Sequence, residues 1–154
     1  MKPAKTASPA VKPLKPVQMR GVLKLVTVED GLRFEADIGG RSVVLDSSKG
    51  ATDGNPVQAL LASIAACSAM DVVEILRKKR QVITAYEIEM SGERSPEHPR
   101  RFTAIEFVHH FKGRGLERAA VEHALQLSVE KYCSVSHSLR PDLPIRHVVE
   151  IAEA

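Results

Sequence analysis

The chain has 154 residues, 44% of them apolar, which is enough for one domain with a sizeable core. Tryptophan is absent and aromatic residues make up only 4%, so few side chains are suited to stacking on nucleic-acid bases. The net charge of +3 comes from interspersed basic and acidic residues, which argues against nucleic-acid binding. Two cysteines are too few for a disulfide-stabilised secreted scaffold, and the first residues lack the apolar stretch of a signal peptide. We therefore expect a cytoplasmic protein with both thiols reduced.

The N-terminal third predicts a tail followed by a small sheet. Residues 1–16 are rich in Pro, Lys and Ala, which predicts a disordered extension before a single domain over 17–154. Alternating apolar and polar residues predict three strands, at 18–29, 32–38 and 41–45. The Gly39-Gly40 pair is typical of a tight hairpin turn, so we expect an antiparallel meander.

A long helix is predicted over Asn55–Gln81, and we expect the rest of the chain to be arranged around it. Asn55 can cap its first turn, and Pro56 suits the first helical position. The helix is apolar on nearly every side, which is typical of a helix buried in a protein core or in a membrane. Asp71 and Glu74 interrupt the apolar run before the roughly 20 residues of a membrane span, which favours a core helix and no membrane contact.

One face of this helix carries polar side chains. Ser63, Cys67, Asp71 and Glu74 are spaced four, four and three residues apart, so they lie along one line. From the helix alone, two interpretations of Cys67 stay open. It is either a buried packing thiol, with the acids where the helix leaves the core, or a reactive thiol.

The C-terminal half predicts a second sheet and further helices. Strands are expected at 85–92 and 102–112 as an antiparallel pair, and a last strand at 146–151. An amphipathic helix is expected over 116–131, with one stripe formed by Val121, Ala124, Leu125 and Ser128. A short helix is expected from Ser134, as its cap, to Leu139, before Pro141. The order βββ-α-ββ-α-α-β indicates an α+β fold.

The second cysteine, Cys133, lies near the end of the second predicted helix and makes a two-thiol chemistry conceivable. Its sulfur can meet that of Cys67 if the two Cα atoms come within about 7 Å. A thiolate that attacks a peroxide becomes a sulfenic acid, and a neighbouring thiol condenses with it to a disulfide. The attacking thiol must be ionised, so it needs a nearby cation or hydrogen-bond donors.

Four stretches together carry a resemblance to a known family: GNPVQALLASIAAC, MDVVEILRKKR, GERSPEHPRRFTAI and LSVEKYCSVSHSL. They resemble the OsmC/Ohr family of osmotically induced protein C and organic hydroperoxide resistance proteins, in its YhfA-like branch. The resemblance covers Gly21 to Ile151. It implies an intertwined homodimer in which two long central helices pack against antiparallel sheets built from both chains, with an active site at each dimer interface.

The same resemblance implies an activity. The family's peroxidases reduce organic hydroperoxides at the expense of a dithiol reductant and need no cofactor. Carried over to this sequence, Cys67 is the peroxidatic thiol and Cys133 the resolving thiol.

The sequence departs from the family's pattern at the residues that activate the thiol. The peroxidases of the family carry a Glu directly after the Asn-Pro pair, where this chain has Val57. They also carry an Arg in the N-terminal strand region, where spacing points to Glu29. Arg33 and Arg41 are alternative sources of the missing positive charge, and Glu130 is a candidate for orienting a base or cation near Cys133.

Two other interpretations stay open. A fold-sharing protein without peroxidase activity would bind a small apolar ligand, or use its thiols as a redox sensor; Val57 and Glu29 favour it. A Cys–His hydrolase would use His137, four residues after Cys133, although we expect His137 at the surface. The six histidines show no metal-binding spacing, and the adjacent His109 and His110 should point to opposite faces of a strand, so we expect no metal.

Overall fold

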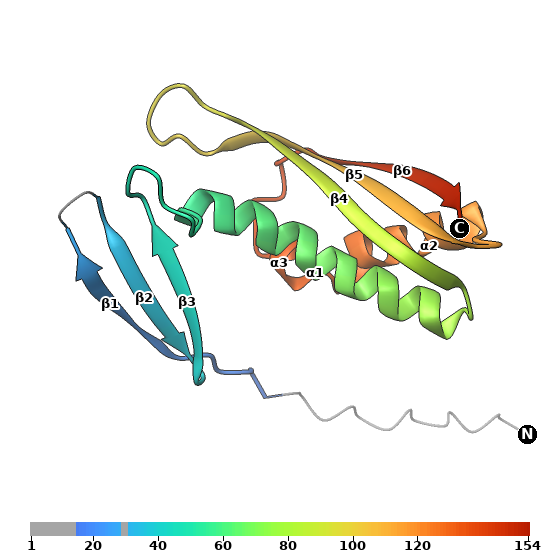
Figure 1. The fold of residues 1–154 in the computed structure, drawn as a ribbon, viewed down its shortest axis with the longest axis horizontal. Helices are drawn as coiled ribbons and strands as arrows, with labels where there is room; N and C mark the ends of the chain where they lie inside the picture. Colours follow the sequence, from blue (N-terminus) through green and yellow to red (C-terminus); the bar gives the residue numbers. More distant parts are fainter. Residues whose placement is uncertain (1–14, 29–30) are drawn as a thin grey trace, which may run out of the picture. The chain divides into compact units, whose positions relative to one another are not determined.

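The chain divides into two compact units, residues 1–53 and residues 54–154, and each is described by itself (Figure 1). The computed structural model describes residues 15–28 and 31–154. The predicted disordered extension over 1–16 therefore lies, apart from Lys15 and Pro16, outside the described residues, and so does Glu29. The organisation of 17–154 as a single domain stays a prediction.

The first unit contains the predicted three-stranded antiparallel meander. Its strands are β1 (Gly21–Thr27), β2 (Arg33–Ile38) and β3 (Arg41–Asp46), paired in the order β1-β2-β3. Ile38 pairs with Arg41 across a two-residue turn, where Gly39 and Gly40 have φ values of 60° and 77°. Positive φ at both central turn residues is the conformation that glycine adopts most readily, so the predicted Gly-Gly hairpin is confirmed.

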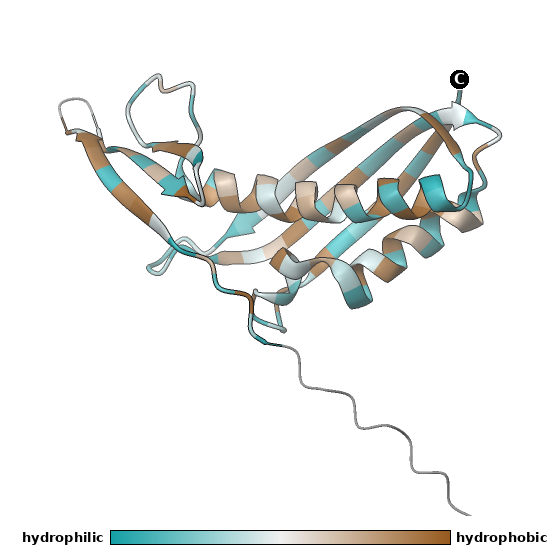
Figure 2. Ribbon diagram, turned by 90° about the horizontal axis from the view of Figure 1, so that it is seen from below, coloured by the Kyte–Doolittle hydropathy of each residue, from teal (hydrophilic) through white to brown (hydrophobic). Residues whose placement is uncertain are grey.

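The first sheet buries little of its own apolar surface. Ala36 and Asp46 are its buried residues among those described, at 8% and 6% exposure. Neighbouring residues of β1 point to opposite faces, yet four of its apolar side chains are more than half exposed: Val22, Leu23, Leu25 and Val26. Figure 2 shows this largely apolar strand. A small sheet with exposed apolar residues on both faces needs another surface to cover it.

The second unit follows the predicted order of elements, with longer strands. It contains α1 (Pro56–Lys78), β4 (Val82–Arg94), β5 (Phe102–Arg114), α2 (Arg118–Leu127), the π-helical turn η1 (Ser128–Tyr132), α3 (Ser134–His137) and β6 (Ile145–Glu153). Strands β4 and β5 pair antiparallel, as predicted. β6 pairs with β5 in parallel, with Ile145 opposite Ile105, so this sheet is mixed. The α+β fold class is confirmed.

The long helix α1 begins as the sequence predicts. Asn55 Oδ1 accepts hydrogen bonds from the backbone N–H groups of Val57 and Gln58, at 3.0 and 3.1 Å. Gln58 Oε1 accepts one in return from the Asn55 N–H at 3.0 Å, which completes a capping box. Among the described residues, α1 is the one helix long and apolar enough to cross a membrane, and 28% of that apolar window is buried within the chain.

Helices α1 and α2 lie on the same face of the β4–β6 sheet (Figures 1 and 2). Between helices and sheet, two buried apolar clusters form the core, one around Val72, Leu76 and Phe111 and one around Ile64 and Phe107. The whole predicted stripe of the second helix is buried, which confirms its orientation: Val121, Ala124, Leu125 and Ser128.

The end of the second helix differs from the prediction. The α-helix stops at Leu127 and continues as a π-helical turn, closed by a bond from the Cys133 N–H to the Ser128 carbonyl at 2.8 Å. The prediction that Ser134 caps the next helix was wrong, because the cap position is taken by Cys133, without a side-chain bond. A π-helical turn holds more residues than an α-helical turn. The residues after it therefore point in other directions than they would in an uninterrupted α-helix. Such π-turns occur frequently at functional sites.

Candidate functional site

The two cysteines, 66 positions apart in sequence, come together with an acid. The Sγ atoms of Cys67 and Cys133 and a carboxylate oxygen of Asp71 all lie within 4.8 Å of one another. Cys67 is half-buried on α1, whereas Cys133, between η1 and α3, has no exposed surface. The structure thus brings together the two thiols that the sequence singles out, and only one of them is open to a small reagent.

The surroundings of Cys133 are those of a sealed thiol. Its Sγ lies 3.0 Å from the hydroxyl oxygen of Ser136 and 4.0 Å from the carbonyl oxygen of Ile64 on α1. Burial raises the pKa of the Cys133 thiol, the hydrogen bond with Ser136 opposes that rise, and the neighbouring Cys67 adds to it. The burial of Cys133 and its raised pKa suit a thiol that reacts second, after a thiol that already lies beside it.

Asp71 lies one helical turn after Cys67 and is oriented by a serine. The Ser128 hydroxyl donates a hydrogen bond to Asp71 Oδ2 at 2.9 Å and lies 3.2 Å from the Ser68 hydroxyl. Within the part of the chain that the structure describes, no Lys or Arg side chain forms an ion pair with Asp71. The sequence pattern places Asp71 on the face of Cys67, but the proximity of both thiols to its carboxylate was missed.

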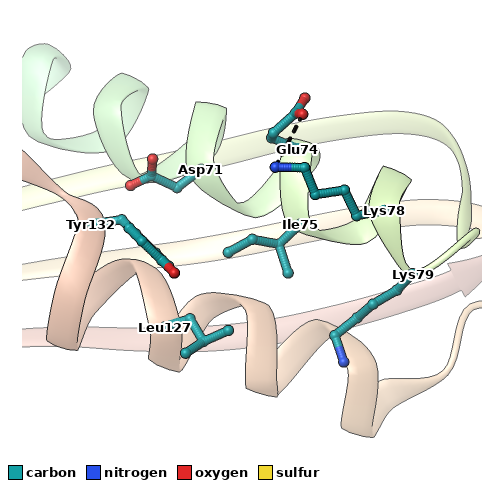
Figure 3. Close-up of a pocket in the computed structure, with 7 residues that line it drawn as sticks. All are labelled: Asp71, Glu74, Ile75, Lys78, Lys79, Leu127 and Tyr132. Atoms are coloured by element: carbon teal, nitrogen blue, oxygen red, sulfur yellow. Dashed lines mark ion pairs between the residues drawn. The ribbon is translucent and has the colours of Figure 1, made fainter. Parts of the chain in front are cut away.

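A pocket of about 420 Å³ opens beside this cluster, between α1 and the end of the second helix (Figure 3). Asp71 and Tyr132 lie at one end and Lys79 at the other, with Ile75 and Leu127 between them. The exposed surface of this lining is mainly apolar.

Comparison with known proteins places this fold in a family. The family model described as OsmC-like protein matches residues 49–148, nearly two thirds of the chain. The chain belongs to the OsmC-like protein family. It is 38% identical over 126 residues to "Protein YhfA" of Escherichia coli K12, covering 81% of this chain and 94% of that protein.

Solved structures agree with this membership. A hypothetical protein from Aquifex aeolicus VF5 superposes with a TM-score of 0.78 at 29% identity, covering 90% of this chain and 99% of that one. The organic hydroperoxide resistance protein OhrB of Bacillus subtilis superposes with a TM-score of 0.59 at 17% identity, covering 87% and 98%. At 17% identity, the match to the B. subtilis protein shows that the two proteins share a fold.

In this OsmC-like chain two of the candidate activating residues, Arg33 and Arg41, belong to the first unit, and Glu130 belongs to the second. Arg33 Nη1 donates to Asp53 Oδ2 at 2.6 Å and to Asp46 Oδ2 at 3.0 Å, so its charge is already offset by two carboxylates of the first unit. These bonds raise the pKa of Arg33, the Asp53 bond most. Arg41 is exposed at the start of β3. Glu130 is exposed and accepts a hydrogen bond from Gln126 at 2.9 Å.

A second polar cluster, which the sequence did not predict, is formed by side chains of the three neighbouring strands β4, β5 and β6 of this OsmC-like chain. The Tyr86 hydroxyl lies 2.7 Å from His109 Nδ1, and His109 Nε2 lies 2.9 Å from His147 Nδ1. His109 is fully buried, which lowers its pKa to about 4, with His147 and His110 adding smaller effects. His110 points to the other face, as predicted, between Glu89 and Glu150. His137 is exposed, also as predicted.

Proposed function

We propose that this OsmC-like chain is a homodimeric, cytoplasmic thiol peroxidase that reduces organic hydroperoxides through Cys67 and Cys133. The observation that carries the proposal is the proximity of the two sulfurs, within 4.8 Å, one thiol half-buried and the other sealed. That difference favours Cys67 as the attacking thiol and Cys133 as the resolving one. Cytoplasmic thiol pools would keep both thiols reduced between reactions.

The reaction balances without a cofactor. The Cys67 thiolate attacks one peroxide oxygen, the O–O bond breaks, and the alcohol leaves with a proton, which makes Cys67 a sulfenic acid. Cys133 then attacks the sulfenyl sulfur and releases water, which forms a Cys67–Cys133 disulfide. The peroxide gains two electrons and the two thiols lose them. An external dithiol then restores both thiols by exchange.

The pocket supports an organic rather than an inorganic peroxide. Ile75, Leu127 and Tyr132 offer apolar surface next to Asp71, whose carboxylate belongs to the thiol cluster. A hydroperoxide with an alkyl or aryl group can place that group there, with its O–O bond toward Cys67. The B. subtilis protein of the same fold is named for organic hydroperoxide resistance, which fits the same class of substrate.

The exposed apolar surface supports the homodimer. Both faces of β1 carry apolar side chains at more than half of their full exposure, and only 28% of the apolar window of α1 is buried within the chain. A second copy of this chain would cover these surfaces, as the intertwined dimer of the family would.

A second candidate is a thiol redox sensor or a binding protein with little peroxidase activity. The specific observation in its favour is Asp71, because a carboxylate beside two thiols opposes the negative charge that the attacking sulfur needs. Val57 stands where the family's peroxidases carry a Glu, and Arg33 is held by two carboxylates of its own unit. In this candidate the thiols react slowly and the pocket holds a small apolar ligand.

A turnover assay separates the two candidates. Reduced protein is mixed with cumene hydroperoxide and dithiothreitol as the dithiol, and peroxide consumption is compared with that by Cys67→Ser and by dithiothreitol alone. The peroxidase predicts many turnovers per chain and faster consumption of cumene hydroperoxide than of hydrogen peroxide. Consumption by wild type at the rate of dithiothreitol alone would refute it in favour of the second candidate.

A further inference from the structure

We propose that reduced Cys67, Cys133 and Asp71 form a binding site for one Zn²⁺ ion per chain. This site goes beyond the peroxidase proposal, because it needs no peroxide and uses the sulfurs as ligands rather than as nucleophiles. The three residues supply two sulfur atoms and one carboxylate oxygen from α1 and from the η1–α3 junction.

The ligand atoms have the type and the spacing that zinc requires. Zinc binds thiolate sulfur at about 2.3 Å and carboxylate oxygen at about 2.0–2.2 Å in a tetrahedral arrangement, so ligand atoms around one ion lie under about 4 Å apart. The three side chains already hold their atoms within 4.8 Å of one another. Small side-chain rotations therefore suffice. Three protein ligands leave the fourth position of the ion for water.

Asp71 is oriented for this role by its neighbour. Ser128 donates to Asp71 Oδ2, while the structure shows no hydrogen bond to Asp71 Oδ1 from any residue it describes. Hydrogen bonds of this kind fix the direction of a metal-binding carboxylate. The π-helical turn links the two parts of the site, because it begins at Ser128 and its closing bond comes from the Cys133 N–H.

The charges of the cluster also favour a cation. Within the described residues, Asp71 forms no ion pair, and the nearby Lys78 is paired with Glu74 at 3.5 Å. Two thiolates and a carboxylate at this spacing would repel one another unless a positive charge lies between them. A divalent cation between the three ligand atoms would provide that charge.

Binding releases protons and involves no redox change. Zn²⁺ displaces one proton from each thiol and pairs with the two thiolates and the Asp71 carboxylate, so two protons leave per ion. A thiolate that shares its negative charge with zinc is a weaker nucleophile toward a peroxide. Zinc and peroxide therefore compete for the same reduced thiols.

The test uses the full-length, reduced, metal-free protein and Co²⁺ as a spectroscopic substitute for Zn²⁺. We expect a thiolate-to-cobalt charge-transfer band that saturates at one Co²⁺ per chain and disappears when Zn²⁺ is added. Asp71→Asn keeps the side-chain shape and removes the anionic ligand. We expect it to weaken Zn²⁺ binding by at least about 100-fold, the upper range for losing a residue that only supports a ligand. Glu74→Gln, an acid on the same helix outside the cluster, should bind as wild type does.

Two results would overturn the proposal. One is a wild-type protein without the charge-transfer band, which requires no variant to fold. The other is an Asp71→Asn protein, folded by circular dichroism, that binds Zn²⁺ as tightly as Glu74→Gln. Peroxide consumption is measured separately on metal-free protein with a chelator present. Cobalt binding without peroxide consumption would refute the peroxidase alone, and the converse would refute the zinc site alone.

Discussion

Two polar clusters lie in the second unit, and they differ in how their polar atoms are satisfied. In the sheet, Tyr86, His109 and His147 form a chain of hydrogen bonds at 2.7 and 2.9 Å. Between α1 and α3, Cys67 and Cys133 lie beside an acid, and no cation pairs with that acid among the described residues.

This difference suits the histidine cluster to a structural role and the cysteine cluster to a reactive one. A buried polar chain whose members are bonded to each other stabilises one arrangement of the core. A thiol pair next to an anion receives little stabilisation from its surroundings. Its sulfur atoms therefore stay available to bind a ligand or to attack a peroxide. Perturbing each cluster should therefore affect different measurements, stability for the histidine chain and thiol chemistry for the cysteine cluster.

The largest expected effect is on the cysteine cluster. Cys67→Ser should reduce consumption of cumene hydroperoxide to the rate of the reductant alone, because a neutral hydroxyl is a much weaker nucleophile than a thiolate. Its free energy of unfolding, measured in urea, should stay near that of wild type. Activity retained by Cys67→Ser would move the chemistry away from this cluster.

The histidine chain should respond in the opposite way. His109→Phe leaves the Tyr86 hydroxyl and His147 Nδ1 without their buried partner, which should lower the free energy of unfolding by about 3 kcal/mol. Thiol oxidation should be unchanged. In the double variant with Tyr86→Phe, the loss should be smaller than the sum of the two single losses. Additive losses would show that the two side chains are not coupled.

The pH dependence of stability should report on the same chain of hydrogen bonds. The pKa of His109 in the folded state, about 4, lies below its unfolded value near 6.5, so the unfolded chain binds the proton more readily. The stabilisation is complete above about pH 6.5 and is lost as the pH falls toward 4, by about 3 kcal/mol at most. His147, whose pKa burial also lowers, acts in the same direction. Urea unfolding across this range checks it, and His109→Phe should reduce the slope.

The smallest expected effect tests the anion beside the thiols. In metal-free protein, Asp71→Asn should speed oxidation of the thiols by cumene hydroperoxide about fivefold, since a unit charge about 5 Å away contributes roughly 1 kcal/mol in a water-like medium. Stopped-flow measurement of sulfenic acid formation gives the rate. Glu74→Gln is the control, and an equal gain in that variant would point to net charge rather than to Asp71.

Local patterns predicted most of the architecture and part of the site. The capping box at Asn55 and the buried stripe around Val121 follow from residues a few positions apart, which the sequence shows directly. The parallel pairing of β6 and the resulting contact between His109 and His147 depend on long-range register. No local pattern encodes that register, so the histidine chain was missed.

The cysteine cluster shows the same division. The four-residue spacing of Cys67 and Asp71 put both on one helix face, and the family resemblance pointed to Cys133. The position of Cys133 depends on the π-helical turn, whose extra residue per turn has no clear sequence signature. The approach of Asp71 to both sulfurs could therefore be found only in the structure.

The proposed function requires Cys67 and Cys133 to act as one redox pair. The most direct measurement is a titration of the reduced, metal-free protein with stoichiometric cumene hydroperoxide, followed by intact and peptide mass spectrometry. A redox pair predicts rapid formation of a Cys67–Cys133 disulfide, which should be absent in Cys67→Ser. In Cys133→Ser, one equivalent of peroxide should leave Cys67 as a sulfenic acid, which further equivalents oxidise to the sulfinic and sulfonic acids. Thiols that stay reduced under one equivalent of peroxide, or that oxidise no faster than free cysteine, would contradict it.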